Sequence, residues 1–165
     1  ADKFVVFDSV QFIDKGWINR NRILHPSIEK GWQYITYPLS GKSNYQAIRD
    51  VRVKKDFDFF DHLKGSISHF KKAPFFDEVS QCLTELEVIT SKHDSISEIN
   101  TLILKELNIT LDLSCEIILE SEVVYDISAV THAGQWALEI SKALNAEVYV
   151  NPIGGKELFN RKEFS

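Results

Sequence analysis

Residues 3–22 read KFVVFDSVQFIDKGWINRNR, an apolar run followed at once by a dense polar segment. The apolar run, Phe4–Phe7, is continuous rather than alternating, which is typical of a strand buried on both faces. Strands of this kind belong to parallel or mixed sheets that helices cover. Ligands in such sheets bind beyond the carboxyl ends of the strands, so the polar segment that starts at Asp8 is the first candidate site.

The rest of the chain predicts further strands and four helices. β-prone residues at 31–39 predict a second strand, and Ala47–Val53 predicts a weaker third strand. Apolar residues recur at helical spacing in four stretches. These are Phe60–Phe70 after an Asp56 cap, Phe76–Leu86, Ile96–Ile103 behind a Ser95–Glu98 capping box, and Ala133–Leu144 after a Thr131 cap.

Two more strands are predicted on either side of the fourth helix, at Cys115–Leu119 and Glu147–Val150. A strand, a helix and a strand in this order are what a parallel crossover needs. We therefore expect an α/β fold: one domain over residues 1–165, with a mixed, partly parallel sheet and helices packed on it.

Composition excludes several classes of protein. The 165 residues predict a single domain with a sizeable core, and 44% hydrophobic with 26% charged residues excludes wholesale disorder. A net charge of −5 argues against a nucleic-acid partner, and no apolar run approaches the ~18 residues of a membrane helix. Two cysteines, Cys82 and Cys115, are too few for a disulfide framework, so we expect a cytoplasmic protein.

The absence of Met and the abrupt opening on a strand predict that an N-terminal segment is missing.

The polar segment after the first strand contains Asn19, Arg20, Asn21 and Arg22 beside Trp17. If the backbone is extended here, the two asparagines point to one face and the two arginines to the other. Two arginines on one face form a planar, multidentate clamp for a carboxylate or a phosphate. In the alternative interpretation the strand is solvated, and its arginines pair with Asp14 or Glu29.

A second candidate is the loop Asn151–Gly155, which follows the last predicted strand. Two consecutive glycines allow a turn whose backbone N–H groups hold an anion, although a plain turn explains the same residues. Neither a P-loop nor a Rossmann fingerprint is present. His62 and His69 lie two helical turns apart, about 10 Å, which is too far for one metal ion, so we expect no metal and no cofactor.

The run from Phe7 to Ile23 resembles the signature of the WbqC-like family. Three further stretches occur in the same order as in that family: Gly31-Trp32 leading to Pro38-Leu39, Lys72–Phe76, and Tyr149 followed by Gly154-Gly155. Family members usually begin with a segment similar to HQPNYLPWxGYFxKI, which is absent here. The resemblance implies a bacterial protein encoded among genes for O-antigen, lipopolysaccharide or other surface polysaccharides, and glycine transfer to a sugar has been suggested for some members.

Together these observations lead us to expect an enzyme of surface-polysaccharide (O-antigen) biosynthesis that transfers an acyl or aminoacyl (glycyl) group to a sugar. Its substrate is expected to be a small anionic or sugar-linked molecule, and a homodimer is left open. The expected catalytic group is Asp8, and the expected substrate-binding residues are Gln11, Lys15, Trp17, Asn19, Arg20, Asn21, Arg22, Asn151, Gly154 and Gly155. The alternatives are a non-catalytic binding or scaffold protein of the same pathway, and a nucleotide-binding regulator.

Overall fold

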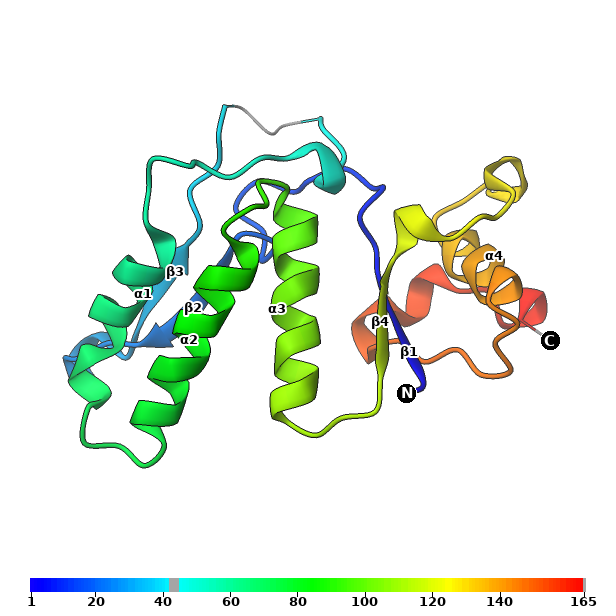
Figure 1. The fold of residues 1–165 in the computed structure, drawn as a ribbon. Helices are drawn as coiled ribbons and strands as arrows, with labels where there is room; N and C mark the ends of the chain where they lie inside the picture. The colour runs from blue at the N-terminus through cyan, green and yellow to red at the C-terminus, as the bar shows by residue number, and fades with distance from the viewer. Residues whose placement is uncertain (42–44, 165) are drawn as a thin grey trace.

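A computed structural model describes residues 1–41 and 45–164 of the chain. Within these residues the strands form two small sheets, one parallel and one antiparallel (Figure 1). The parallel pair is β1 (Lys3–Val6) with β4 (Glu116–Leu119), and the antiparallel pair is β2 (Arg20–Leu24) with β3 (Trp32–Thr36). The predicted α/β class with partly parallel pairing is confirmed, and the pairing is divided between two sheets.

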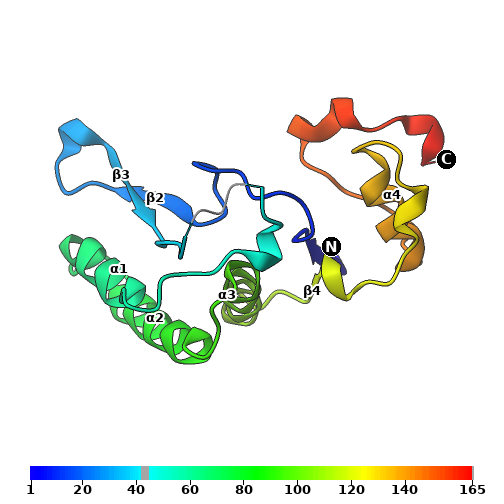
Figure 2. The same ribbon diagram turned by 90° about the horizontal axis from the view of Figure 1, so that it is seen from above.

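The four predicted helices are all present. They are α1 (Phe59–Ile67), α2 (Phe76–Thr90), α3 (Ile96–Thr110) and α4 (Gln135–Ala143). Helices α1 to α3 stand in a row, and the β2–β3 hairpin lies along one side of that row (Figures 1 and 2). The stacked rings of Tyr37 and Phe59, with centroids 4.2 Å apart, join the end of the hairpin to the start of α1.

The helix caps differ from those that the sequence predicted. Asp58, not Asp56, caps α1, because its side chain accepts a hydrogen bond from the backbone N–H of Asp61. Ser95 occupies the N-cap position just before α3, but its hydroxyl donates to the carbonyl of Arg49 at 3.0 Å and makes no cap bond. The capping-box prediction was therefore wrong, although the helix that it marked is real.

The fourth helix also starts differently from the prediction. Gly134 precedes its first residue, and the Thr131 side chain donates to Gln135 Oε1 at 2.8 Å. Asp112 and Asn145 take the left-handed conformation just beyond α3 and α4, with φ of 52° and 51°. Asn and Asp tolerate this conformation, which ends a helix.

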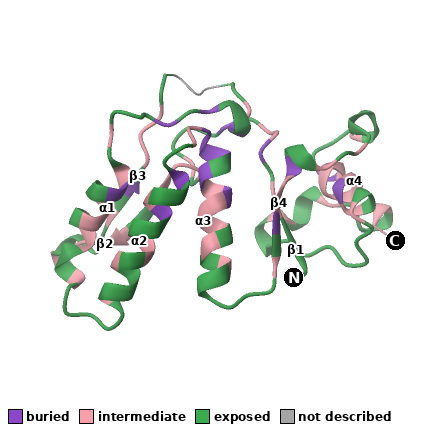
Figure 3. Ribbon diagram, viewed as in Figure 1, coloured by how far each residue is buried: buried purple, intermediate pink, exposed green. Residues whose placement is uncertain are grey.

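The main core lies where the N-terminal end of α3 meets the segments that cross it, as the buried residues in Figure 3 show. Ile96 and Ile99 pack there with Val51 and Val53. The predicted third strand, Ala47–Val53, is a 3-10 turn at Ile48–Asp50 followed by isolated bridges. Its two valines, Val51 and Val53, are nevertheless both buried in this core.

The predicted last strand, Glu147–Val150, does not form. Val148 and Val150 are 76% and 77% exposed, and the next residues form 3-10 turns at Ile153–Leu158 and Arg161–Glu163. Tyr149 packs instead on Phe159 and Phe164, the residues that follow these two turns. The predicted crossover through α4 was therefore wrong; the parallel connection runs from β1 through α1–α3 to β4.

Candidate functional site

The exposed face of the β2–β3 hairpin collects aromatic and arginine side chains. The register pairs Arg22 with Tyr34 and Leu24 with Trp32, which places Arg20 and Arg22 on the same face as the two aromatic residues of β3. Trp17, in the turn before β2, lies beside them. We call Trp17, Arg20, Arg22, Trp32 and Tyr34 the aromatic–arginine face. The register of β2 confirms the prediction that Arg20 and Arg22 lie on one face of the strand.

Each arginine of this face lies over aromatic rings. The Arg22 guanidinium carbon is 4.8 Å from the ring centre of Trp17 and 4.7 Å from that of Trp32. The Arg20 guanidinium carbon is 4.4 Å from the ring centre of Tyr34, and Tyr34 meets Trp32 edge-on at 4.9 Å. Cation–π contacts at these distances stabilise a guanidinium without neutralising its charge. The face therefore presents fixed positive charge among exposed rings.

The two arginines nevertheless differ in what they bind. Arg20 donates from Nε to the carbonyl of Gly16 at 2.8 Å and from a second nitrogen to the carbonyl of Lys15, so it holds the turn that carries Trp17. The guanidinium of Arg22 makes no hydrogen bond or ion pair within residues 1–41 and 45–164. Neither arginine pairs with an acid among those residues, which favours the clamp over the ion-paired strand. Arg22 is the residue of the pair that is open to an anion.

The other polar residues of the predicted cluster lie away from this face. Asn19 donates from Nδ2 to the carbonyl of Tyr37 at 2.9 Å and so ties the hairpin together beyond its ladder. Asn21 accepts the N–H of Arg22 at 2.8 Å. Gln11 is exposed and forms an isolated bridge with Ala47 outside the hairpin. Lys15 contributes its backbone carbonyl to Arg20.

Asp8 lies at the carboxyl end of β1, as predicted, but it is 1% exposed. Its two carboxylate oxygens accept hydrogen bonds from the N–H and the hydroxyl of Ser121, at 3.0 and 2.9 Å. In return, the N–H of Ser9 donates to the carboxylate of Glu120 at 3.2 Å, and Glu120 also accepts the Tyr125 hydroxyl. We call Asp8, Ser9, Glu120, Ser121 and Tyr125 the acid clasp.

The acid clasp is reciprocal, because the residue after each buried acid donates its N–H to the other acid. Glu120 is 2% exposed, so both carboxylates are buried and both are hydrogen-bonded, the condition that makes buried acids tolerable. Burial, together with the hydrogen bond to Glu120, raises the pKa of Tyr125, which keeps its hydroxyl a donor. Asp8 thus joins the ends of β1 and β4, and the structure does not expose it as an acid/base group.

The remaining predicted residues, Asn151, Gly154 and Gly155, lie in the segment that follows α4. The N–H of Gly155 donates to the carbonyl of Pro152 at 3.0 Å, and Asn151 accepts the Tyr149 hydroxyl at 3.2 Å. In Figures 1 and 2 this segment lies on the β1–β4 side of α3, whereas the hairpin lies along α1 and α2. The structure therefore does not bring the glycine loop and the two arginines into one pocket.

The described part of the chain contains no group of three or more His, Cys, Asp and Glu side chains placed to hold a metal ion. Among the same residues, no helix combines the length and the apolar character that spanning a membrane requires.

The model of the WbqC-like protein family matches residues 1–165, so the chain belongs to this family. Over 115 residues it is 26% identical to an uncharacterized protein of Mycobacterium tuberculosis, Rv1507c. That match covers 69% of this chain and 48% of the relative, so the chain spans about half the length of the curated relative that it matches. No solved structure matches the chain.

Proposed function

We propose that this WbqC-like domain serves bacterial surface-polysaccharide (O-antigen) biosynthesis as a transferase that moves an acyl or aminoacyl (glycyl) group to a sugar. In this proposal the aromatic–arginine face binds the anionic, sugar-linked substrate. The single observation that supports it is the guanidinium of Arg22, which lies over two indole rings without an acid partner among the described residues.

The chemistry of the face suits such a substrate. A guanidinium binds a phosphate or a carboxylate through two parallel hydrogen bonds, which a point charge does not reproduce. The indoles of Trp17 and Trp32 are 56% and 45% exposed, which leaves apolar ring surface for the C–H face of a sugar. Because the rings already support the guanidinium of Arg22, less conformational entropy is lost when a ligand binds.

A second function, a non-catalytic binding protein of the same pathway, is favoured by one observation. Asp8, the predicted acid/base group, is buried and has both oxygens occupied by Ser121. Among the described residues, no carboxylate forms an ion pair with Arg22. Binding and transfer are therefore tested separately.

The binding test is calorimetric titration with a nucleoside diphosphate sugar, compared with the free sugar and with inorganic phosphate. Arg22→Lys keeps the charge but loses the two-pronged geometry, so its affinity should fall about ten- to a hundredfold. Arg52→Lys is the matched control, because Arg52 is exposed and pairs with Asp94 outside the hairpin. Equal affinities for the wild type and Arg22→Lys would refute the proposed site.

The transfer test asks whether the bound sugar gains a glycyl group. The protein is incubated with the nucleotide sugar and a glycyl thioester, and the sugar is examined by mass spectrometry. A glycylated sugar that is lost in Arg22→Ala supports the transferase. The same assay is also run on a chain that spans the full length of its relatives. If that chain binds the nucleotide sugar tightly but forms no glycylated sugar, the non-catalytic binding protein is supported instead.

A further inference from the structure

The loop end of the β2–β3 hairpin presents exposed apolar side chains. The last pair of the ladder, Leu24 with Trp32, lies next to the loop, residues 25–31. Leu24 is 63% exposed, Trp32 is 45% exposed, and Ile28 within the loop is 96% exposed. We call Leu24, Ile28, Lys30 and Trp32 the hairpin tip. In both Figures 1 and 2 this loop lies at the outer edge of the molecule, on the side of α1, which agrees with the exposure of the tip.

Hydrogen bonds close the loop on itself. The N–H of His25 donates to the carbonyl of Gly31 at 3.1 Å, and the N–H of Ser27 donates to His25 Nδ1 at 2.9 Å. Gly31 has a φ of 65°, a conformation that glycine adopts without strain, and its N–H donates to the carbonyl of Ile28 at 3.1 Å. The exposed side chain of Ile28 is therefore carried by a turn that is built before any partner arrives.

The segment that contains the tip is positively charged, in contrast to the chain as a whole. Residues 14–32 contain four Lys and Arg side chains against two acids, Asp14 and Glu29, whereas the net charge of the whole chain is −5. Neither Arg22 nor Lys30 forms an ion pair among the described residues. Charge complementarity therefore favours an anionic partner at this end of the molecule.

The two faces of the hairpin differ, as those of a strand pair at an apolar boundary do. Ile35, on the inner face, is 5% exposed, whereas the outer face combines Arg22 with Trp32 and Tyr34. Tryptophan and tyrosine are enriched at the headgroup level of bilayers, because their rings have an apolar body and a polar end. Arginine and lysine there bind lipid phosphates. A second copy of the same face would instead bring Arg22 and Lys30 against like charges.

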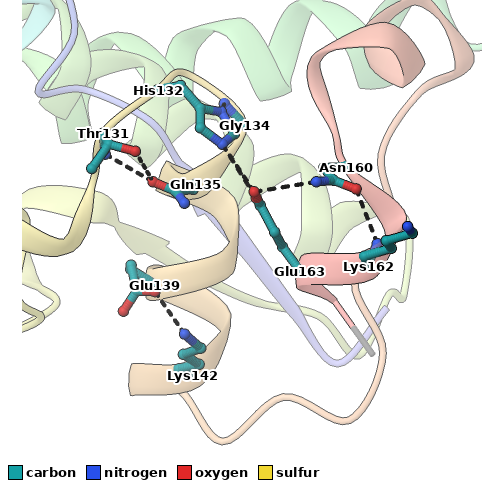
Figure 4. A network of polar contacts seen from close by, with 9 residues as sticks. All are labelled: Thr131, His132, Gly134, Gln135, Glu139, Lys142, Asn160, Lys162 and Glu163. Atoms are coloured by element: carbon teal, nitrogen blue, oxygen red, sulfur yellow. Dashed lines mark hydrogen bonds and ion pairs between the residues drawn. The ribbon is translucent and has the colours of Figure 1, made fainter.

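Exposed aliphatic side chains also occur in the segment after α4, but acids balance the bases there. Ile153 is 83% exposed, and residues 146–164 contain three basic and three acidic side chains. One of these acids, Glu163, accepts a hydrogen bond from Asn160 at 3.4 Å and lies 3.3 Å from His132 Nε2 (Figure 4). Apolar exposure without excess positive charge makes this segment a source of control variants.

We propose that the hairpin tip docks on the surface of an anionic lipid bilayer. Leu24 and Ile28 enter the boundary between headgroups and acyl chains, Trp32 lies at the headgroup level, and Lys30 and Arg22 meet lipid phosphates. The proposal goes beyond the proposed function and does not rest on the transfer reaction. Because Arg22 is the next residue from Leu24 on the same face, docking also brings the proposed substrate site to the membrane surface.

The test is co-sedimentation of the protein with vesicles made of equal parts of phosphatidylglycerol and phosphatidylcholine. The protein should sediment with these vesicles, should stay in solution with vesicles of phosphatidylcholine alone, and should be released by added salt. The double variant Leu24→Ser/Ile28→Ser should lose about tenfold or more in affinity. The matched control is Leu111→Ser/Ile153→Ser, with side chains 64% and 83% exposed on other surfaces, and its affinity should be unchanged.

The variant Lys30→Gln tests the charge of the tip separately from its apolar side chains. It should lose about fivefold in affinity for the mixed vesicles. Neither Lys30→Gln nor the double variant changes a residue of the aromatic–arginine face, so both should bind the nucleoside diphosphate sugar like the wild type. A failed membrane surface and a failed substrate site therefore give different results.

Three vesicle results would overturn the proposal: equal binding to the mixed and the phosphatidylcholine vesicles, equal losses in the double variant and its control, or no binding to either vesicle. Sedimentation without vesicles adds a further outcome. A dimer that the double variant converts to a monomer would show that a second copy covers the tip, and would also overturn it. Melting curves check that each variant is folded, and Lys30→Gln with the salt series decides the question if the double variant does not fold.

Discussion

Replacing Ser121 with Ala should destabilise the protein by removing one donor from the acid clasp. The Ser121 hydroxyl donates to the carboxylate of Asp8 at 2.9 Å, and Asp8 is 1% exposed, so the substitution removes a donor from a buried carboxylate oxygen. A buried acceptor left without its donor costs about 1–3 kcal/mol. For a domain of this size, that predicts a melting temperature lower by about 2–12 °C.

Ser9→Ala provides the matched control. Ser9 has the equivalent position after the other strand, but it contributes its backbone N–H to Glu120, which alanine keeps. Its hydroxyl only accepts a bond from the exposed side chain of Arg49 at 3.3 Å, so its loss should cost less than about 0.5 kcal/mol. Both variants are followed by circular dichroism melting and by urea unfolding. Equal losses in the two variants, or no loss in Ser121→Ala, would refute the reasoning about the clasp.

Two more predictions concern Tyr125 of the acid clasp and Gly134 at the start of α4. Burial beside Glu120 raises the pKa of Tyr125 above its ordinary value of 10.0, so the stability that this hydroxyl contributes is present below pH 10 and is lost as the pH rises above it. The variant Tyr125→Phe should therefore lose less stability at alkaline pH than the wild type, measured by urea unfolding between about pH 8 and pH 11. The same pH profile in the variant and the wild type would contradict this. The variant Gly134→Ala places a methyl group against the backbone carbonyl of Leu158, so it should lower the free energy of unfolding by about 1–3 kcal/mol and speed proteolysis within residues 146–164. Gly154→Ala is the control: its methyl group meets open space, so its stability and its proteolysis should match those of the wild type.

Local patterns in the sequence predicted the elements that bury their own apolar side chains. The helical spacing that includes Ile96 and Ile99 carries this information within a few residues, and both isoleucines are buried. The strand predicted at Phe4–Phe7 also formed, but the prediction that it is buried on both faces was wrong, because Phe4 and Phe7 are 50% and 37% exposed. Glu147–Val150 has the same β-prone character, but a strand also needs a partner edge. In this chain Tyr149 packs on Phe159 and Phe164, and the local sequence pattern does not predict this packing.

The candidate site was predictable to a similar extent. The alternation of a strand placed Arg20 and Arg22 on one face, because a period of two needs no tertiary information. Their different partners depend on how the turn at Lys15 and Gly16 folds back, which the spacing does not reveal. Glu120 was missed because its partner Ser9 is 111 positions away; the available signal was an acid directly after a buried strand, as at Asp8.

The acid clasp also sets an order of events in time. Asp8 and Ser121 are 113 positions apart, whereas the β2–β3 hairpin closes over a few residues. Closing the longer loop costs roughly 2 kcal/mol more in chain entropy than closing the hairpin. On a ribosome that adds roughly 5–20 residues per second, β1 leaves the tunnel roughly 6–23 seconds before its partner. For that interval the strand Lys3–Val6 has no β4 to pair with, so it remains available to a chaperone that binds extended apolar segments.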